Sequence, residues 1–274
     1  AIFSPNGGYI SDPQFSTRNI QLAAERPGAA FLFNSRVKEI PTKNASVEGV
    51  LLSDGTRINA PVVINVAGPH SSQINAMVGV DVDMKISTRA LRQEVAHVPV
   101  PKGIDYSAVA CVTSDSDAAV YTRPEVGNNI LIGSEDPPCD THIYVDPDNY
   151  NSNFSNQWTL QAQRLGLRFP NLGIPSKLKG CVDLYDVTED WIPIYDRSCV
   201  EGYFMACGTS GNQFKNAPVV GKVMAELIEY CESGSNHDED PMLYQLKNID
   251  QEISLATFSR LREINQNSSF SVLG

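Results

Sequence analysis

The sequence predicts two interleaved domains, one of α/β type and one dominated by an antiparallel sheet. Three observations predict this architecture. Helical and strand patterns mix over residues 1 to 84, strand-like alternation prevails from about residue 85, and a strand, a glycine turn and a helix follow residue 178. With 274 residues, the chain is long enough for one large domain or two smaller ones.

The first 84 residues contain both helix and strand signals. Asp12 can cap a helix that begins at Pro13, and the apolar spacing continues this helix to Ala24. An Asp54-Gly55 pair between apolar runs predicts a hairpin over residues 47 to 58. Short apolar runs and helical spacing predict the remaining elements, which are strands at 29–33, 35–40 and 62–68 and a helix at 71–78.

Residues 85 to 177 alternate between apolar and polar side chains, which is typical of an antiparallel sheet with one exposed face. The expected strands are 89–98, 107–113, 118–122 and 129–133, with a helix at 157–167 and a further strand at 178–185. An acidic linker at 232–240 precedes a helix that we expect around residues 241 to 255. The chain therefore closes with a C-terminal extension.

The strongest indication of function lies between Gly202 and Ile228. The apolar strand from Tyr203 to Ala206 enters a turn with glycines at 208 and 211, and a helix with an apolar stripe leaves that turn. Glycines let the backbone approach a ligand closely, and amides before a helix N-terminus favour a negatively charged or polarised group. Lys215 is the one cation within the turn. The alternative interpretation is a tight strand-to-helix connection without a ligand.

Composition narrows the class of protein. A net charge of −11 argues against nucleic acid or an anionic membrane surface as the main partner, since both attract clustered Lys and Arg. No apolar run approaches the ~20 residues that span a bilayer. The six cysteines are scattered without a Cys-x-x-Cys pair, and the four histidines form no metal-ligand pattern, so we expect no metal site. Scattered thiols favour a reducing compartment, which we expect to be the cytoplasm.

Four segments resemble, in the same order, the D-amino-acid oxidase / sarcosine oxidase / glycine oxidase family of FAD-dependent oxidoreductases. They are Gly7 to Ile40, Val62 to Pro69, Tyr121 to Gly133, and Tyr185 to Gly221. The resemblance implies FAD as the cofactor. It also implies an incomplete FAD-binding, glutathione-reductase-like domain at 1–84 and 178–234, an antiparallel-sheet substrate-binding domain at 85–177, and a C-terminal extension at 235–274.

The family's Gly-x-Gly-x-x-Gly motif, which holds the FAD pyrophosphate, does not occur in these 274 residues. The sequence resembles the C-terminal two-thirds of such an enzyme. We therefore expect the missing N-terminal FAD-binding segment, or a second subunit, to be a partner. We also expect this chain alone to bind FAD weakly or not at all, which a flavin absorbance titration tests.

The resemblance assigns roles to particular residues. Lys215 would hold a substrate carboxylate, against the alternative of a solvated lysine at a helix start. Arg123 would face the substrate pocket, against the alternative of a surface carboxylate, and Tyr121 would line the substrate cavity, against the alternative of core packing. Tyr185 is a further residue that lines a substrate cavity in this interpretation. The residues implied to contact FAD are Val37 at the adenine, Ala67 and Gly68 at a strand end, and Gly208, Thr209, Ser210, Gly211, Asn212, Gln213 and Phe214 in the turn.

The implied reaction is oxidation of an amine or amino acid, by hydride transfer from a substrate carbon to flavin N5, with an imine as product. Two alternatives stay open. Oxidation of a 2-hydroxy acid would require a base such as His70, His97 or His142, and a non-catalytic subunit would require no chemistry. Asp183, not Cys181, occupies the position where some relatives attach flavin covalently, so we expect no flavin–cysteine bond. The two cations of the tail at 258–262 dock on this chain or on a neighbouring subunit, a choice that the sequence leaves open.

Overall fold

The computed structural model describes residues 2–109 and 111–273, and the chain forms two compact units. Unit 1 consists of Ala1–Asn34, Glu94–Pro137 and Ser152–Asp183, and unit 2 of Ser35–Gln93, Pro138–Asn151 and Leu184–Gly274. Two long strands, β7 (Arg89–Pro99) and β12 (Gly180–Val187), run through the unit boundaries and pair with each other. These units divide the chain at other positions than the predicted domain ranges, and the predicted ranges stay a prediction.

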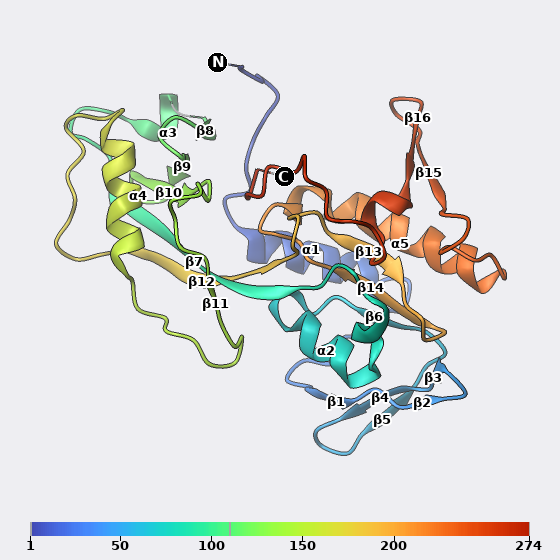
Figure 1. The fold of residues 1–274 in the computed structure, drawn as a ribbon. Coiled ribbons are helices and arrows are strands. Elements are labelled where there is room, and N and C mark those ends of the chain that lie inside the picture. Colours follow the sequence, from blue (N-terminus) through green and yellow to red (C-terminus); the bar gives the residue numbers. More distant parts are fainter. Residues whose placement is uncertain (1, 110, 274) are drawn as a thin grey trace. The chain divides into compact units, whose positions relative to one another are not determined.

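Unit 1 is built on an antiparallel sheet, as the alternating sequence predicts. Its strands follow the order β7-β10-β9-β8, with β10 at Asn129–Ser134, β9 at Val120–Glu125 and β8 at Thr113–Asp115. Helix α4 (Asn156–Gly166) lies along this sheet (Figure 1), capped by Ser155, whose hydroxyl accepts the Gln157 amide. The core between helix and sheet is apolar and contains Ala96, Val98, Ile130, Ile132, Trp158, Ala162 and Leu165.

Unit 2 has three layers. Its central sheet has the order β13-β14-β6, with β14 (Tyr203–Cys207) parallel to β6 (Val63–Asn65) and antiparallel to β13 (Ile194–Arg197). Alternate residues of β14 face opposite layers, as the period of a strand dictates. Phe204 and Ala206 pack with helix α5 (Ala217–Glu232), whereas Tyr203 and Met205 pack with side chains of α2 (Ser71–Val78). Figure 1 shows α5 and α2 on opposite sides of β14.

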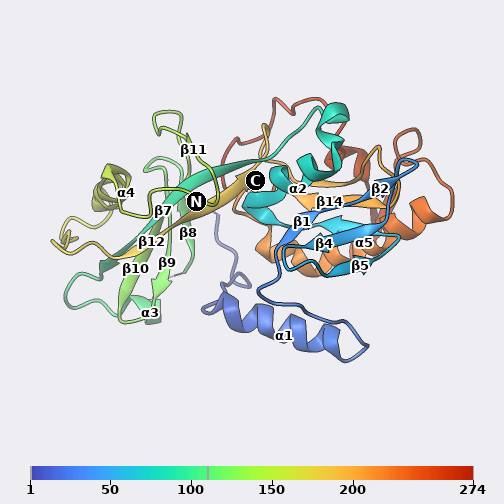
Figure 2. The ribbon, with the colours of Figure 1, turned by 90° about the horizontal axis from the view of Figure 1, so that it is seen from below.

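Smaller elements complete unit 2. A three-stranded sheet has the order β1-β4-β5 (Val37–Glu39, Gly49–Leu52 and Arg57–Asn59), and Figure 2 shows its β4–β5 hairpin, which confirms the predicted hairpin. The remaining strands and 3-10 helices of the unit are β2 (Thr42–Lys43), β3 (Ser46–Val47), η1 (Gly68–His70), η2 (Val80–Asp83), β11 (Ile143–Tyr144), η3 (Gln213–Asn216), β15 (Leu243–Leu246), β16 (Gln251–Ser254) and η4 (Leu255–Phe258).

Helix α1 (Pro13–Glu25) forms where the sequence predicts it, and the Asp12 carboxylate accepts the Phe15 amide at 3.0 Å. None of its residues is buried. The strand predicted at 29–33 is wrong: these residues are coil, and Phe31, Leu32 and Phe33 are exposed. An apolar run becomes a strand only when its backbone groups pair, and within the described residues this run has no strand partner.

Two further predicted elements differ in the structure. Part of the strand predicted at 107–113 is the helical turn α3 (Tyr106–Val109), which the Asp105 carboxylate caps through the Ala108 amide; residue 110 lies outside the described residues. The helix predicted at 241–255 is instead the hairpin β15–β16, followed by η4. Alternate burial explains the hairpin, because Tyr244 is buried while its neighbour Leu243 is exposed.

The tail at 258–262 docks on its own chain. The Arg260 side chain is 2% exposed and binds three carboxylates, at 2.7 Å to Asp83, 3.2 Å to Asp196 and 2.7 Å to Asp238. A buried guanidinium is stable only when its donors and charge are matched in this way. The structure therefore resolves the choice that the sequence leaves open for this cation.

In the part of the chain that the structure describes, no helix combines the length and the apolar composition required to cross a membrane. Within the same residues, no group of three or more His, Cys, Asp or Glu side chains is arranged to hold a metal ion.

Candidate functional site

The turn between β14 and α5 has an unusual backbone. Gly208, Ser210 and Gly211 have φ angles of +70°, +49° and +74°. The left-handed region suits glycine but is uncommon for serine, so Ser210 needs support from its surroundings. Its amide donates to the carbonyl oxygen of Asp186 at 2.8 Å, and its hydroxyl donates to the Gly208 carbonyl at 3.2 Å. Such conformations cluster at ligand sites.

Asp186, on β12, anchors this turn. Its carboxylate accepts the Gly208 amide at 2.7 Å and also the Thr209 hydroxyl. Burial raises the pKa of the Asp186 carboxyl, while the hydrogen bonds from Thr209 and Gly208 oppose that rise. The carboxylate is thus directed into the backbone of the turn and fixes its shape.

Close packing explains why both turn glycines are required. A Cβ at Gly211 would lie 2.5 Å from the Tyr185 ring, and a Cβ at Gly208 would lie 2.4 Å from the Thr188 methyl group. Both distances are far below van der Waals contact. The tyrosine ring therefore covers the turn backbone directly, which only glycine permits.

A cavity of about 790 Å³ opens beside this turn, within unit 2. Apolar side chains from β6 and α5 form most of its wall, and Tyr185, Asp186, Thr209 and Gln213 supply polar atoms. Tyr195 also lines it and donates its hydroxyl to Gln213 Oε1 at 3.1 Å. Burial, followed by the Asp186 charge, raises the pKa of the Tyr195 phenol, so the phenol stays a neutral donor. The apolar wall contains Ile64, Val66, Leu184, Phe214, Ala217, Val220, Gly221, Met224 and Ile228.

The cavity brings together part of the residue set predicted for the cofactor. Five of these residues line it: Gly68, Thr209, Gly211, Gln213 and Phe214. Of the others, Gly208 and Ser210 are buried in the turn, and Ala67 precedes η1. Asn212 is buried, and its side-chain Nδ2 has no hydrogen-bond partner within the described residues, which leaves a donor at the turn.

Lys215 lies in η3 and is exposed to solvent. It is not among the residues that line the cavity, although Phe214 before it and Ala217 after it are. Its predicted role as a carboxylate ligand stays a prediction.

Val37 lies at a second, smaller cavity in unit 2 of about 260 Å³. His70 and Asp148 line it as well, and the His70 imidazole contacts the Asp148 carboxylate at 3.1 Å. Arg36 contacts the same carboxylate at 2.8 Å. Hydrogen bonds from His70 and then Arg36 lower the pKa of the Asp148 carboxyl.

Arg123 and Tyr121 lie in unit 1, on β9. The Arg123 guanidinium makes an ion pair with Glu125 at 2.9 Å and lies 5.3 Å from the centre of the Tyr9 ring. The Tyr121 ring packs on Gly133 of the neighbouring strand β10, where a Cβ would lie 2.1 Å from it. Their predicted substrate contacts stay predictions.

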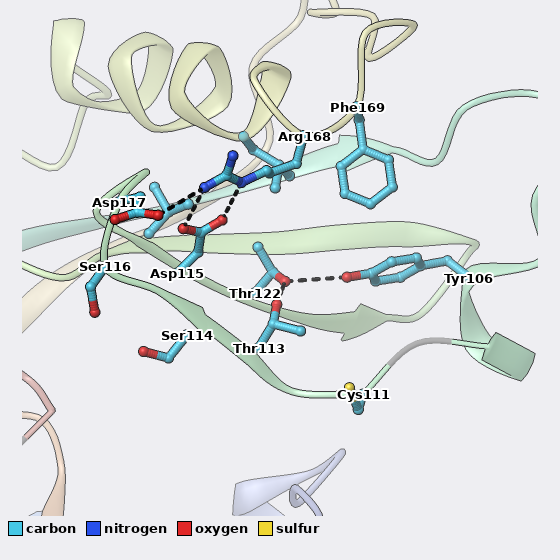
Figure 3. A pocket seen from close by; sticks show the side chains of 12 residues that line it. Tyr106, Cys111, Thr113, Ser114, Asp115, Ser116, Asp117, Thr122, Arg168 and Phe169 are labelled. Atoms are coloured by element: carbon cyan, nitrogen blue, oxygen red, sulfur yellow. Dashed lines mark hydrogen bonds and ion pairs between the residues drawn. The ribbon is translucent and has the colours of Figure 1, made fainter. Parts of the chain in front are cut away.

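Unit 1 has its own cavity, of about 630 Å³, on the other face of β9 (Figure 3). Thr122 lines it, and its hydroxyl contacts the hydroxyls of Thr113 and, at 3.2 Å, of Tyr106. Arg168 crosses its rim and binds Asp115 at 2.5 Å and 3.0 Å, as Figure 3 shows. The three hydroxyls contact one another and Arg168 binds Asp115, so these groups are engaged within the protein.

Sequence reasoning missed Asp186 and Tyr195 as residues of the larger cavity. One sequence signal could have identified Asp186: it is an acidic residue at the otherwise apolar end of a strand, Leu184 to Val187. The alternation of the strand places its side chain in the interior. Tyr195 gives none, since a tyrosine on a buried strand is more often core. The contributions of Ile64 and Val66 depend on their partial exposure, which only coordinates reveal.

Comparisons with known proteins agree on one family. A family model described as FAD dependent oxidoreductase matches residues 1–227. FAD-dependent oxidoreductase domain-containing protein 1 of Xenopus laevis is 25% identical over 184 residues, which cover 62% of this chain and 35% of that protein. Sarcosine oxidase subunit beta of Rhodobacter capsulatus is 27% identical over 202 residues, which cover 73% of this chain and 45% of that protein. The chain thus spans less than half the length of these curated relatives.

Solved structures show the same fold. The L-proline dehydrogenase from P. horikoshii superposes with a TM-score of 0.65 at 23% identity, covering 79% of this chain and 55% of that one. Glycine oxidase from Bacillus cereus gives a TM-score of 0.59 at 20% identity, covering 82% of this chain and 56% of that one.

Proposed function

Because the chain belongs to the FAD-dependent oxidoreductase family, we propose that it forms the flavin-facing and substrate-facing part of an enzyme that oxidises a small amine or amino acid. The glycine turn that opens on the apolar cavity of unit 2 carries this proposal. When bound, FAD would accept a hydride from the carbon beside the amine nitrogen, and the resulting imine would hydrolyse in water.

The cavity of unit 2 fits a flavin ring by its chemistry. Apolar side chains, among them exposed Val66 and Phe214, suit an aromatic ring system, and Thr209 and Gln213 add polar atoms to the wall for its polar edge. Asn212, in the same turn, is not a lining residue, and its buried Nδ2 is a donor without a partner within the described residues. Gly211, whose φ is +74°, lines the cavity, so the turn backbone has no Cβ atom at this residue beside that edge. Donors placed there favour negative charge on the bound ring.

Lys215 and Val37 take the roles that the resemblance implies. We assign Lys215, one residue after the cavity wall, to the substrate carboxylate, and Val37 with its small cavity to the adenine. Within the described residues no histidine lines the larger cavity, which favours amine oxidation over oxidation of a 2-hydroxy acid, for which a base is required. Amine oxidation requires no such base from this chain.

The proposal includes a partner, either an N-terminal FAD-binding segment or a second subunit. Strand β6 is at the end of its sheet in the described residues, its side chain Ile64 is 41% exposed, and Val66, just after the strand, is 69% exposed. An edge strand presents backbone N–H and C=O groups that a further strand can pair with, so this edge suits a strand that brings the pyrophosphate motif. A non-catalytic subunit would pair with a partner through the same edge, and an activity assay distinguishes it from the enzyme. Free thiols at Cys111, Cys181, Cys199, Cys207 and Cys231 support a reducing compartment, which we propose to be the cytoplasm.

The test uses the whole flavin-loaded protein and a panel of amino acids, N-methyl amino acids and neutral amines. We expect flavin reduction by a substrate with a carboxylate, and Lys215→Met should raise its KM by about tenfold or more, the loss expected for one charged hydrogen bond. Lys222→Met, an exposed lysine on α5, is the control and should change nothing. No flavin reduction by any amine of the panel would contradict the proposal, and equal effects of the two variants would contradict the assignment of Lys215.

A further inference from the structure

The C-terminal segment, defined here as residues 259–268, lies beyond the family match, which ends at residue 227. It carries a second buried arginine besides Arg260. The Arg262 side chain is 7% exposed and binds the fully buried Asp190 through two bonds, Nη2 to Oδ1 at 2.8 Å and Nε to Oδ2 at 3.0 Å. This two-pronged geometry is the strongest form of a carboxylate contact and requires arginine.

Arg262 also holds the loop that contains Asp190. Its guanidinium donates to the carbonyl oxygens of Ile192 at 2.6 Å and Pro193 at 3.2 Å. From the same segment, Ser268 donates its hydroxyl to the Asp190 carbonyl at 2.5 Å, and the Asn265 amide donates to the Asp190 carboxylate at 3.3 Å. Six hydrogen bonds therefore join the C-terminal segment to a single loop.

This loop, residues 188–193, has a conformation that requires such support. Trp191 has a φ of +60°, which is an outlier for a bulky residue, although its side chain is buried against Leu91 and Val187. Asp190 Oδ1 accepts the Ile192 amide at 3.1 Å and the Thr188 hydroxyl at 3.2 Å. The carboxylate that Arg262 binds is thus the one that shapes the loop.

The loop is coupled directly to the glycine turn. The Thr188 methyl group occupies the place that a Cβ of Gly208 would need, at 2.4 Å. Two residues before Thr188, on β12, the Asp186 carboxylate accepts the Gly208 amide at 2.7 Å. A continuous path of contacts therefore runs from Arg262 through Asp190 and Thr188 to the turn.

We infer that the C-terminal segment is a built-in clamp on the cofactor turn, with Arg262 as its positioning residue. The clamp keeps the turn in its ligand-ready shape before the ligand arrives, so less ordering is required on binding. This inference rests on the proposed function for the identity of the ligand as FAD. The coupling of the segment to the turn does not depend on that identity.

The first arm of the test measures amide hydrogen exchange of the whole protein without FAD. In Arg262→Gln, we expect the Gly208 and Ser210 amides to exchange about tenfold faster or more, the factor for losing a charged hydrogen-bond pair, while the β14 amides of Phe204 and Met205 keep their rates. Uniformly faster exchange across unit 2, or no change at the turn, would overturn the inference. If the glutamine variant does not fold, Arg262→Lys replaces it. Lysine keeps the charge but loses the two-pronged carboxylate contact, so we expect an intermediate change in exchange.

The second arm titrates FAD into the same variants. We expect Arg262→Gln to weaken FAD binding by about tenfold or more. Unchanged affinity together with faster exchange at the turn would overturn the positioning role. The control is Glu263→Gln, at the neighbouring, 85% exposed carboxylate that pairs with Lys85, and it should leave both readouts unchanged. The titration uses the longer protein that includes the N-terminal FAD-binding segment or the second subunit. If that protein, without substitution, binds no FAD, the proposed function fails, while the exchange arm still decides whether the clamp exists.

Discussion

Gly211→Ala tests the geometry of the turn most sharply. The new Cβ would lie 2.5 to 2.7 Å from three atoms of the Tyr185 ring, at a residue whose φ is +74°. A left-handed conformation costs alanine about 1 to 2 kcal/mol. Overpacking of a rigid site costs a further 1 to 3 kcal/mol or so. We therefore expect the free energy of unfolding to fall by about 2 to 5 kcal/mol.

Gly221→Ala is the matched control. Gly221 lies in α5, lines the same cavity and has no atom within 4 Å of a Cβ position, so alanine meets open space there. Alanine in a helix interior is favoured over glycine by about 1 kcal/mol, and we expect that gain in this chain. If a further segment packs on α5 in a longer protein, the same substitution should become destabilising there.

The assay is urea unfolding, with the free energies of both glycine variants compared at equal m-values. A double-mutant cycle with Tyr185→Ala separates the two costs, because removal of the ring relieves the overlap but leaves the backbone strain. A loss of less than about 0.5 kcal/mol for Gly211→Ala, the range of ordinary surface substitutions, would refute the left-handed turn under the tyrosine ring.

Three further substitutions test the charged groups. Burial raises the pKa of Asp186, so its contribution to stability is present below the unfolded value near 3.8 and is lost as the pH rises through the folded value. Asp186→Asn should therefore gain stability relative to wild type as the pH rises above 3.8, and a pH-independent difference would contradict this. The Arg168 hydrogen bond lowers the pKa of Asp115 to about 2, so that contribution is present above 3.8 and is lost as the pH falls toward about 2; in Arg168→Gln an NMR titration should find this pKa raised toward 3.8. Arg260→Met leaves three aspartates facing an apolar side chain and should cost about 3 to 5 kcal/mol in urea unfolding, whereas a loss below 1 kcal/mol or so would show that the buried network is dispensable.

Local signals were sufficient for many elements of the fold. The Asp12-Pro13 pair predicts the start of α1, and alternation predicts the antiparallel strands of unit 1. The strand prediction at 29–33 is wrong because a strand also depends on a pairing partner, which the apolar pattern of the run does not specify. The hairpin after Met242 has a short apolar pattern that fits the period of a helix as well as that of a strand. Tertiary packing of Tyr244 decides in favour of the strand.

For the site, the glycine turn was visible in the sequence because glycine spacing reports backbone conformation directly. Its supports were not visible. Asp186, Asp190 and Arg262 are 76 residues apart at most along the chain, from 186 to 262, and meet only through the fold. The tail arginines illustrate the limit, since two cations in a polar segment look solvent-exposed until the buried carboxylates facing them are known.

A crystal structure of the longer protein with FAD bound decides whether the glycine turn is a flavin site. We expect the flavin ring within about 4 Å of the turn from Thr209 to Phe214, with its polar edge toward the Asn212 side chain. A flavin bound elsewhere, with a different segment covering this turn and the wall of α5, would contradict it.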